Sequence, residues 1–258
     1  MARADDFISA SGITDPKFIK SAKGLFADLI NFGFIQSVYP SQNISLDKIV
    51  ALYPRSGGTS TSNNMNCINP AKFNLTQSGG YTHAFDGSTP DGTTGYCDTG
   101  INMLNELPNY NITIAYLAMT NIAPGSSENR FPFGVIQGTT QQSLNFYSTN
   151  NIQAFSTGSA QQSVGSVSNY KKMYGVIRLN DSLMSLYGDN AKLATDNTTL
   201  TIDRHADANL YLDALNNGGT AAYFNNNKCG AFAVANGMTD NEWKIFINLI
   251  ASFKAGLI

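Results

Sequence analysis

The chain has 258 residues, the size of one large all-β domain or of one domain with an appended helical segment. It carries 16 Lys and Arg against 18 Asp and Glu, a net charge of −2, without long runs of one sign. This balance offers no basic surface to nucleic acid or to an anionic membrane, so we expect binding to neither. Only 13% of the residues are charged while 42% are hydrophobic, so Asn, Ser, Thr, Gln and Gly supply most of the polarity. That composition is typical of a turn-rich β protein.

The predicted helices lie near the two ends of the chain. The first follows the sequence Thr-Asp-Pro at 14–16, which supplies a cap and a first-turn proline, and it ends near Gly33. Its apolar stripe is Phe18, Ala22, Leu25 and Leu29. The second follows a capping box formed by Thr239 and Glu242. Its apolar face is Trp243, Phe246, Ile247, Ile250 and Phe253. Both helices are amphipathic and need a surface to cover.

Between the helices the apolar residues recur with period two and are interrupted by Gly, Asn, Ser and Pro. We predict strands at 111–119, 133–136, 143–147, 172–179, 182–187, 210–215 and 221–224. A set of this size indicates a sandwich or a barrel. Asn180 and Asp181 are predicted to form a tight hairpin turn. The polar, glycine-rich segment 55–66 is either a hinge or a packed entry strand.

Neither a membrane span nor an export signal is visible in the sequence. No stretch approaches the roughly 18 apolar residues that a spanning helix needs. Asp5 and Asp6 stand where a signal peptide would need a basic head and an apolar core, so we expect no export by the usual route. The cysteines are odd in number and far apart, which indicates neither a disulfide framework nor a thiolate zinc site. Cys67, Cys97 and Cys229 are therefore predicted to be reduced, buried thiols.

Three segments carry a more specific signal, namely residues 73–83, 90–100 and 227–242. They resemble a concanavalin A-like (laminin-G-like) sandwich module, in the version found in structural proteins of tailed bacteriophages of the crAss-like kind. The segments 12–15 and 52–58 are similar to the region that precedes this module, so the resemblance covers nearly the whole chain. Its strongest motif is the final strand running into a capped terminal helix.

The resemblance implies a mainly β, concanavalin A-like antiparallel β-sandwich (jelly-roll) with N-terminal and C-terminal amphipathic helices. We expect an N-terminal helical segment and entry linker at 1–60, and the sandwich with its C-terminal helix at 61–258. The resemblance also implies a non-enzymatic virion structural protein, assembled in the bacterial cytoplasm, as a capsid decoration, head-fibre or tail-accessory component. Its expected partners are other virion proteins and copies of itself. The alternative is a carbohydrate- or receptor-binding module that mediates adhesion to host or mucus glycans, because this fold alone does not choose between such roles.

The sequence offers little material for catalysis. A glycosidase needs two carboxylates roughly 5 to 9.5 Å apart, commonly offered along one strand. Glu106, Glu128 and Glu242 are isolated, so such a site would need Asp residues from separate loops. His83 and His205 lie far apart in the sequence and do not suggest a catalytic triad or a multi-histidine metal site. We therefore expect no enzyme activity, no nucleotide binding and, for His83, a packed or edge position.

Two sets of residues are candidates for ligand binding. Asp203, Asp207 and Asn209 alternate along the chain and carry the oxygen ligands that suit calcium, although a solvated loop is the other interpretation. Calcium is the one cofactor that we consider. Aromatic side chains predicted on loops could stack on sugar rings, although most aromatics in a sandwich fill its core. The aromatic candidates are Tyr96, Phe131, Tyr147, Tyr170 and Tyr187.

Overall fold

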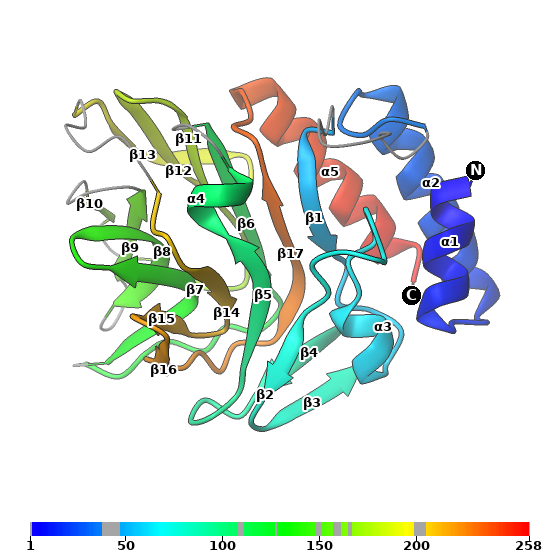
Figure 1. Cartoon of the computed structure of the whole chain (residues 1–258), viewed down its shortest axis with the longest axis horizontal. Helices are drawn as coiled ribbons and strands as arrows, with labels where there is room; N and C mark the ends of the chain where they lie inside the picture. Colours follow the sequence, from blue (N-terminus) through cyan, green and yellow to red (C-terminus); the bar gives the residue numbers. More distant parts are fainter. Residues whose placement is uncertain are drawn as a thin grey trace.

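The computed structural model describes residues 2–37, 47–107, 111–126, 128–147, 151–156, 161–164, 167–198 and 205–257. Two β-sheets lie face to face, and helices pack on one side of the pair (Figure 1). Both chain ends lie on this helical side (Figure 1). The predicted mainly β sandwich with helices toward both ends of the chain is confirmed.

The first sheet, sheet A, has the strand order β13-β12-β11-β6-β17-β4-β3, with β1 also pairing with β17. Its pairs are antiparallel. The strands are β1 (Ile49–Tyr53), β3 (Tyr81–Ala84), β4 (Gly87–Pro90), β6 (Ile112–Ala118), β11 (Met173–Asn180), β12 (Leu183–Gly188), β13 (Ala191–Asp196) and β17 (Cys229–Ala235).

The second sheet, sheet B, has the order β10-β9-β8-β7-β14-β5-β2, and β15 pairs with both β7 and β16. Only the β15–β7 pair of those described is parallel. The strands are β2 (Thr76–Ser78), β5 (Tyr96–Asn102), β7 (Asn129–Gln137), β8 (Thr140–Tyr147), β9 (Asn151–Ser156), β10 (Gln161–Val164), β14 (Asn209–Leu212), β15 (Leu215–Asn217) and β16 (Thr220–Ala222).

Alternation along the central strands of sheet A separates two hydrophobic cores. On β6, Ile114 and Tyr116 point into the core between the sheets, whereas Ala115 faces the helices. On β17, Phe232 and Val234 face sheet B in the same way. The residues of β17 that face the helices are Ala231, Ala233 and Ala235. Because these side chains are small, a helix can approach this face of the sheet closely.

The two predicted helices are α2 (Pro16–Asn31) and α5 (Asp240–Ala255). Asp15 caps α2 by accepting a hydrogen bond from the Phe18 N–H at 2.8 Å, and Thr239 with Glu242 forms the capping box of α5. Three helices were not predicted, namely α1 (Ala2–Ser11), α3 (Ser60–Asn64) and α4 (Met103–Glu106). Helix α3 lies in the segment interpreted as a hinge or an entry strand, and it is too short to show a helical period.

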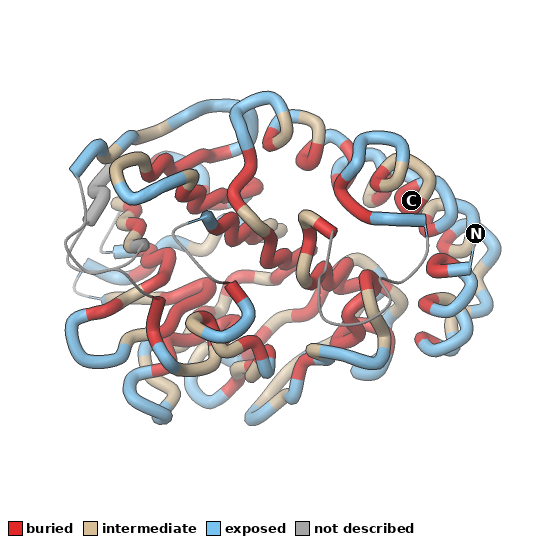
Figure 2. The backbone as a smooth tube through the Cα atoms, turned by 45° about the horizontal axis from the view of Figure 1, so that its top comes forward, coloured by how far each residue is buried: buried red, intermediate tan, exposed pale blue. Residues whose placement is uncertain are grey.

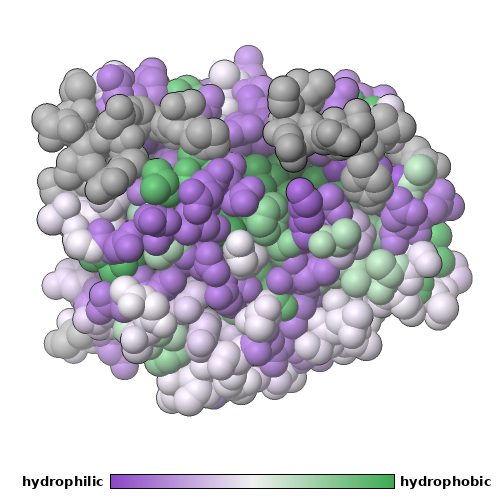
Figure 3. Space-filling model, in the orientation of Figure 1, coloured by the Kyte–Doolittle hydropathy of each residue, from purple (hydrophilic) through white to green (hydrophobic). Residues whose placement is uncertain are grey.

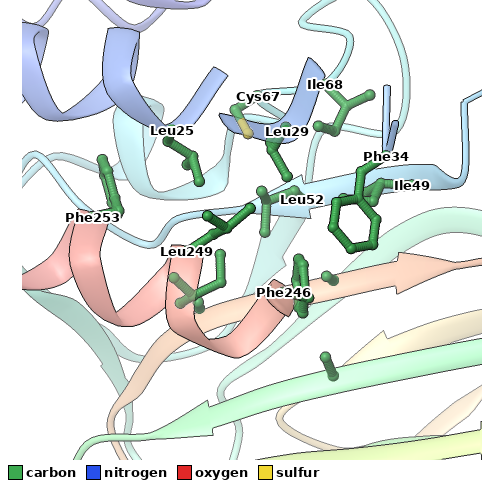
Figure 4. Close-up of a cluster of buried hydrophobic side chains, with 14 of the residues drawn as sticks. Leu25, Leu29, Phe34, Ile49, Leu52, Cys67, Ile68, Phe246, Leu249 and Phe253 are labelled. Atoms are coloured by element: carbon green, nitrogen blue, oxygen red, sulfur yellow. The ribbon is translucent and has the colours of Figure 1, made fainter. Parts of the chain in front are cut away.

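The helices bury their apolar stripes against sheet A and against one another. Leu25 and Leu29 of α2 and Leu52 of β1 belong to the same buried cluster as Phe246 and Leu249 of α5 (Figure 4). Strand β1 lies inside the segment expected to be an entry linker, and it pairs with β17. This segment therefore contributes directly to sheet A.

Trp243 marks the closest approach of α5 to sheet A. Its ring is fully buried beside Tyr187, with 5.6 Å between the ring centroids, and its Nε1 donates to the Asp189 carbonyl at 2.9 Å. Gly175 of β11 lies directly beneath, where a Cβ would be 2.6 Å from Trp243 Cη2. The indole occupies the space that a side chain at 175 would need.

Two cations, the buried Arg3 and the partly buried Lys254, attach the ends of the chain to the rest of the fold. The Arg3 guanidinium of α1 donates to Asp47 Oδ2 at 2.8 Å. The Lys254 ammonium of α5 donates to the Pro54 carbonyl at 2.6 Å and to Ser56 Oγ at 2.7 Å. Charge-assisted hydrogen bonds of this kind are stronger than neutral ones, so they hold the helices in register with the entry segment.

One predicted strand, 210–215, is two strands in the structure. Asp213 separates β14 from β15 because its backbone is in the left-handed region, with φ at 65°. Strand β14 pairs with β7 in the antiparallel sense, and after the turn at Asp213 strand β15 pairs with β7 in the parallel sense. The apolar alternation that predicted one strand carries no signal for this reversal.

Burial follows the strands and the inner sides of the helices, while the connections and the outer turns of the helices are exposed (Figure 2). The face seen in Figure 3 is largely hydrophilic or neutral in hydropathy, with apolar residues gathered toward its middle. Among the described residues, no helix has the length and apolar character needed to cross a membrane.

We expect Gly175→Ala to lower the free energy of unfolding by about 1 to 3 kcal/mol, because the new methyl group overlaps the Trp243 ring. Gly24→Ala is the matched control, since a Cβ on this helical glycine of α2 meets no atom within 4 Å. It should raise stability by up to about 1 kcal/mol through helix propensity. Urea denaturation measures both, and equal effects of the two substitutions would contradict the close contact.

Candidate functional site

The sandwich has one outer face that the described helices leave uncovered. Helix α5 packs on the outer face of sheet A, α2 packs on α5 and α1 on α2 (Figure 1). Helix α4 contributes Met103 to the core between the sheets. The outer face of sheet B is called the open face here. Its residues are those that alternate with the inward-facing residues of each strand. Tyr147 and Tyr223 are exposed on it, whereas Asn145 and Phe131 between them are buried.

A row of amide side chains crosses three strands on the open face. Leu144 and Phe146 of β8 point into the core, so Asn145 between them points outward. Asn145 Nδ2 donates to Asn129 Oδ1 of β7 at 2.7 Å and to Gln153 Oε1 of β9 at 3.4 Å. Both amine hydrogens of Asn145 are thereby used, and its Oδ1 is buried without a hydrogen-bond partner in the described part of the chain.

Aromatic side chains border this amide row. Tyr147 is 40% exposed and lies directly opposite Asn129 in the β7–β8 pair. The same pair has a bulge between Arg130 and Phe133, which places Phe131 beside Asn145. Phe131 packs against Tyr223, with 5.7 Å between the ring centroids. We call Asn129, Asn145, Gln153, Phe131, Tyr147 and Tyr223 the amide–aromatic patch.

A glycine positions the inner edge of the patch. A Cβ on Gly134 of β7 would lie 2.8 Å from Ser143 Cβ, 2.8 Å from Leu215 Cδ1 and 3.3 Å from Phe131 Cδ1. The side chains of Phe131 and Leu215 thus lie over the backbone of β7. Only the absence of a side chain at 134 lets the Phe131 ring lie this close to the sheet.

A second aromatic group lies on the neighbouring strands of the open face. Tyr96 of β5 stacks on Tyr211 of β14 with 4.8 Å between the ring centroids, and Phe224 lies 6.4 Å from Tyr96. Tyr223 and Phe224 are consecutive, so one short segment supplies a ring to each aromatic group. The open face therefore presents aromatic rings next to amide groups, which is the combination that binds the apolar faces and the hydroxyl groups of sugars.

Tyr223 is held in an unfavourable backbone conformation. Its φ is 55°, a region that bulky residues rarely adopt, and its side chain is 51% exposed. Its carbonyl accepts the Phe131 N–H at 3.0 Å, which fixes the segment next to β7. A strained, exposed aromatic residue held by its surroundings is the kind of feature that marks functional sites.

A buried polar network supports this segment from inside the sandwich. The Asp213 carboxylate is fully buried and accepts from Tyr81 Oη at 2.9 Å, Asn225 Nδ2 at 3.0 Å and Tyr116 Oη at 3.3 Å. The Arg55 guanidinium lies 5.6 Å from the centroid of the Tyr81 ring. Burial raises the pKa of Asp213 to about 6, against the opposing effects of Arg55 and the hydrogen bonds.

The structure describes two of the three candidate calcium ligands. Asp203 lies outside the described residues. Asp207 Oδ1 accepts from Asn102 Nδ2 at 3.0 Å, whereas Asn209 Nδ2 donates to Asp98 Oδ2 at 3.2 Å. Within the described ranges, no group of three or more His, Cys, Asp or Glu side chains could hold a metal ion. Calcium binding by Asp203, Asp207 and Asn209 therefore stays a prediction, and we derive no function from it.

The five aromatic candidates divide between the open face and the interior. Tyr96, Phe131 and Tyr147 lie on the open face. Phe131 is 5% exposed, so it supports the exposed Tyr223 ring and does not offer its own ring to a ligand. Tyr170 packs edge-on against Phe146 in the core between the sheets, and Tyr187 lies beneath α5 against Trp243. The prediction that Tyr170 and Tyr187 bind a ligand is wrong, because both side chains are buried and neither can offer its ring to a ligand.

The other predicted side chains have structural surroundings. The three cysteines are free and buried, as predicted, and burial raises the pKa of each thiol. His83 lies between Gln77 Oε1 at 2.8 Å and Ser88 Oγ at 2.9 Å, and burial lowers its pKa. This is the packed position expected for it.

Sequence reasoning missed Tyr223 and the amide row. Tyr223 falls inside the strand predicted at 221–224, whereas β16 ends at Ala222 and Tyr223 lies in the connection to β17. Asn145 and Gln153 are two of many amides in the chain, and only the pairing of β8 with β9 brings them together. The outward position of Asn145 between two core residues was the one available signal.

No family model and no curated protein matches the sequence. The two-sheet sandwich is similar to several solved structures, which supports the concanavalin A-like fold of the resemblance and gives no link to phage. A Trypanosoma rangeli sialidase mutant matches with a TM-score of 0.58 and 12% identity over 90% of this chain and 39% of its own. This chain thus spans about two fifths of the sialidase.

Two further structures share the sandwich. Botulinum neurotoxin type C, whose cell entry depends on interaction with two ganglioside molecules, matches with a TM-score of 0.50 and 12% identity over 69% of this chain and 47% of its own. Domain 4 of the Geobacillus stearothermophilus arabinanase AbnA, in complex with arabinotriose, has a TM-score of 0.54 and 11% identity over 76% of this chain and 97% of its own. At these identities the similarity shows the concanavalin A-like fold alone.

We expect the raised pKa of Asp213 to make stability depend on pH. Its folded value of about 6 lies above the ordinary 3.8, so the folded state holds the proton more tightly than the unfolded state. The free energy of unfolding should therefore fall as the pH rises from about 4 to about 6, by an amount on the order of 3 kcal/mol from this group.

Asp213→Asn should remove this part of the pH dependence, while the exposed Asp181→Asn should retain it. Urea denaturation at several pH values measures the slope. An unchanged slope in Asp213→Asn would show that this carboxylate does not titrate as its burial requires.

Proposed function

We propose that this chain is a non-enzymatic, lectin-like module that binds a glycan on the open face of sheet B. The observation that carries the proposal is the amide–aromatic patch on the sheet surface that no described helix covers. Aromatic rings pack on the C–H faces of sugars, and amides both donate to and accept from hydroxyl groups. The neurotoxin and the arabinanase domain support it, because their structures are described with a ganglioside interaction and with arabinotriose.

The absence of catalysis belongs to the same proposal. Asp98 is the single carboxylate in the nine strands of sheet B. A glycosidase of the usual kind needs two carboxylates facing one sugar. Glu128 and Glu242 lie in a loop and in the capping box of α5, where they bind Arg130 and Lys48. We therefore propose binding of the glycan without hydrolysis.

We expect Tyr223→Asn to reduce glycan affinity by about tenfold or more, as removal of a stacking ring costs about 1 to 3 kcal/mol when that ring is central to a site. Asparagine tolerates a left-handed backbone, so the variant should stay folded. Phe32→Ala is the matched control, because Phe32 is 54% exposed but follows α2 on the helical side.

Binding is measured on a glycan array and then by calorimetry with the glycan that binds best. Equal losses in both variants would argue against the patch, and so would full affinity in Tyr223→Asn. Release of reducing sugar from a bound glycan would contradict the non-enzymatic part of the proposal.

The virion role remains a proposal that rests on the sequence resemblance to phage structural proteins. In it, the helical layer on sheet A would dock to other virion proteins or to a second copy, and the open face would point outward. Mass spectrometry of purified particles of a phage that encodes the chain tests it by counting copies relative to the major capsid protein. Absence from the particle would exclude the virion role and leave glycan binding standing.

A further inference from the structure

The described strands of the open face carry almost no charge. The nine strands of sheet B contain only two charged residues, Arg130 and Asp98. All other polar side chains on these strands are amides or hydroxyls. Recognition of a carboxylate or sulfate group requires a cation that is free to pair with it.

The one cation is already paired. Arg130 Nη2 lies 2.7 Å from Glu128 Oε2, and its Nη1 donates to Asn226 Oδ1 at 2.5 Å. The Arg130 side chain is 17% exposed. An anionic ligand would have to displace Glu128 to reach the guanidinium, and the displaced carboxylate would repel it.

The remaining charge is negative and lies within the second aromatic group. Asp98 Oδ1 accepts from the Gly100 N–H at 2.8 Å, and its Oδ2 accepts from Asn209. Burial and then the charge of Asp98 raise the pKa of the Tyr211 hydroxyl. The field of this carboxylate therefore reaches the aromatic group and opposes a second negative charge there.

The amide row also suits a neutral partner. Both amine hydrogens of Asn145 are used within the row, and its Oδ1 is a buried acceptor without a partner among the described residues. Asn145 itself is 3% exposed, so a ligand meets the partly exposed amides of Asn129 and Gln153. Uncharged amides bind hydroxyl groups but form no ion pair with an acidic sugar.

We infer that the open face selects neutral oligosaccharides and excludes sialylated and sulfated ones. This inference rests on the proposed glycan binding and adds the chemical class of the ligand. It sets this chain apart from glycan binders that pair a cation with an acidic sugar.

The test is an array of neutral oligosaccharides printed beside sialylated and sulfated derivatives of the same cores. We expect neutral cores to bind and their anionic derivatives to bind at least about tenfold more weakly. Affinity for a neutral core should change less than about twofold between about 0.05 and about 0.5 M NaCl, since no ion pair forms. Asp98→Asn should narrow the gap in affinity between the neutral and anionic forms. Asp181→Asn, in the exposed turn between β11 and β12, makes the same change of net charge and should leave the gap unchanged.

The outcomes separate this inference from the proposed function. Anionic derivatives that bind as tightly as their neutral cores, or a loss of affinity in high salt, would overturn the selectivity while glycan binding stands. A gap that Asp98→Asn leaves unchanged would overturn its electrostatic basis. Failure of the folded wild-type chain to bind any glycan on the array would instead overturn the proposed function.

Discussion

The close packing of α5 on sheet A is the contact on which the rest of the arrangement depends. The outward side chains of β17 are alanines, and Gly175 of β11 leaves room for the Trp243 ring. With α5 seated there, α2 packs onto α5 and β1 pairs with β17. This layer closes one outer face of the sandwich, so sheet B is left to present the other.

Those parts of the fold that depend on local pattern could be predicted from the sequence. The caps at Asp15 and Thr239 and the period-two strands such as β6 express preferences of neighbouring residues, and the structure has them where the pattern indicates. The reversal at Asp213 could not be predicted, because its left-handed backbone is stabilised by hydrogen bonds from Tyr81 and Tyr116, which are distant in sequence. The backbone propensity of a residue depends on its sequence neighbours and not on hydrogen-bond partners that are distant in the sequence.

The candidate site was less predictable than the fold for the same reason. Exposure of an aromatic ring depends on which face of a strand it occupies and on what covers that face. Tyr187 and Tyr147 are both strand tyrosines, yet the first lies beneath α5 and the second on the open face. The amide row likewise exists only because β7, β8 and β9 are adjacent and in a register that aligns their side chains.

The two sheets differ in the polar groups that stabilise them, which accounts for the low charge of sheet B. Arg3 and Lys254 bind oxygen atoms in the helical layer, whereas Asp213 belongs to the polar network between the sheets. The outer face of sheet B uses amides that bond to one another in place of ion pairs. A surface whose polar groups are mostly uncharged amides and hydroxyls attracts anions weakly and responds little to salt, while it still offers donors and acceptors. Packing of the core stabilises the left-handed backbone conformations of Tyr223 and Asp213. The aromatic rings of the open face are therefore fixed before a ligand binds, and less conformational freedom is lost on binding.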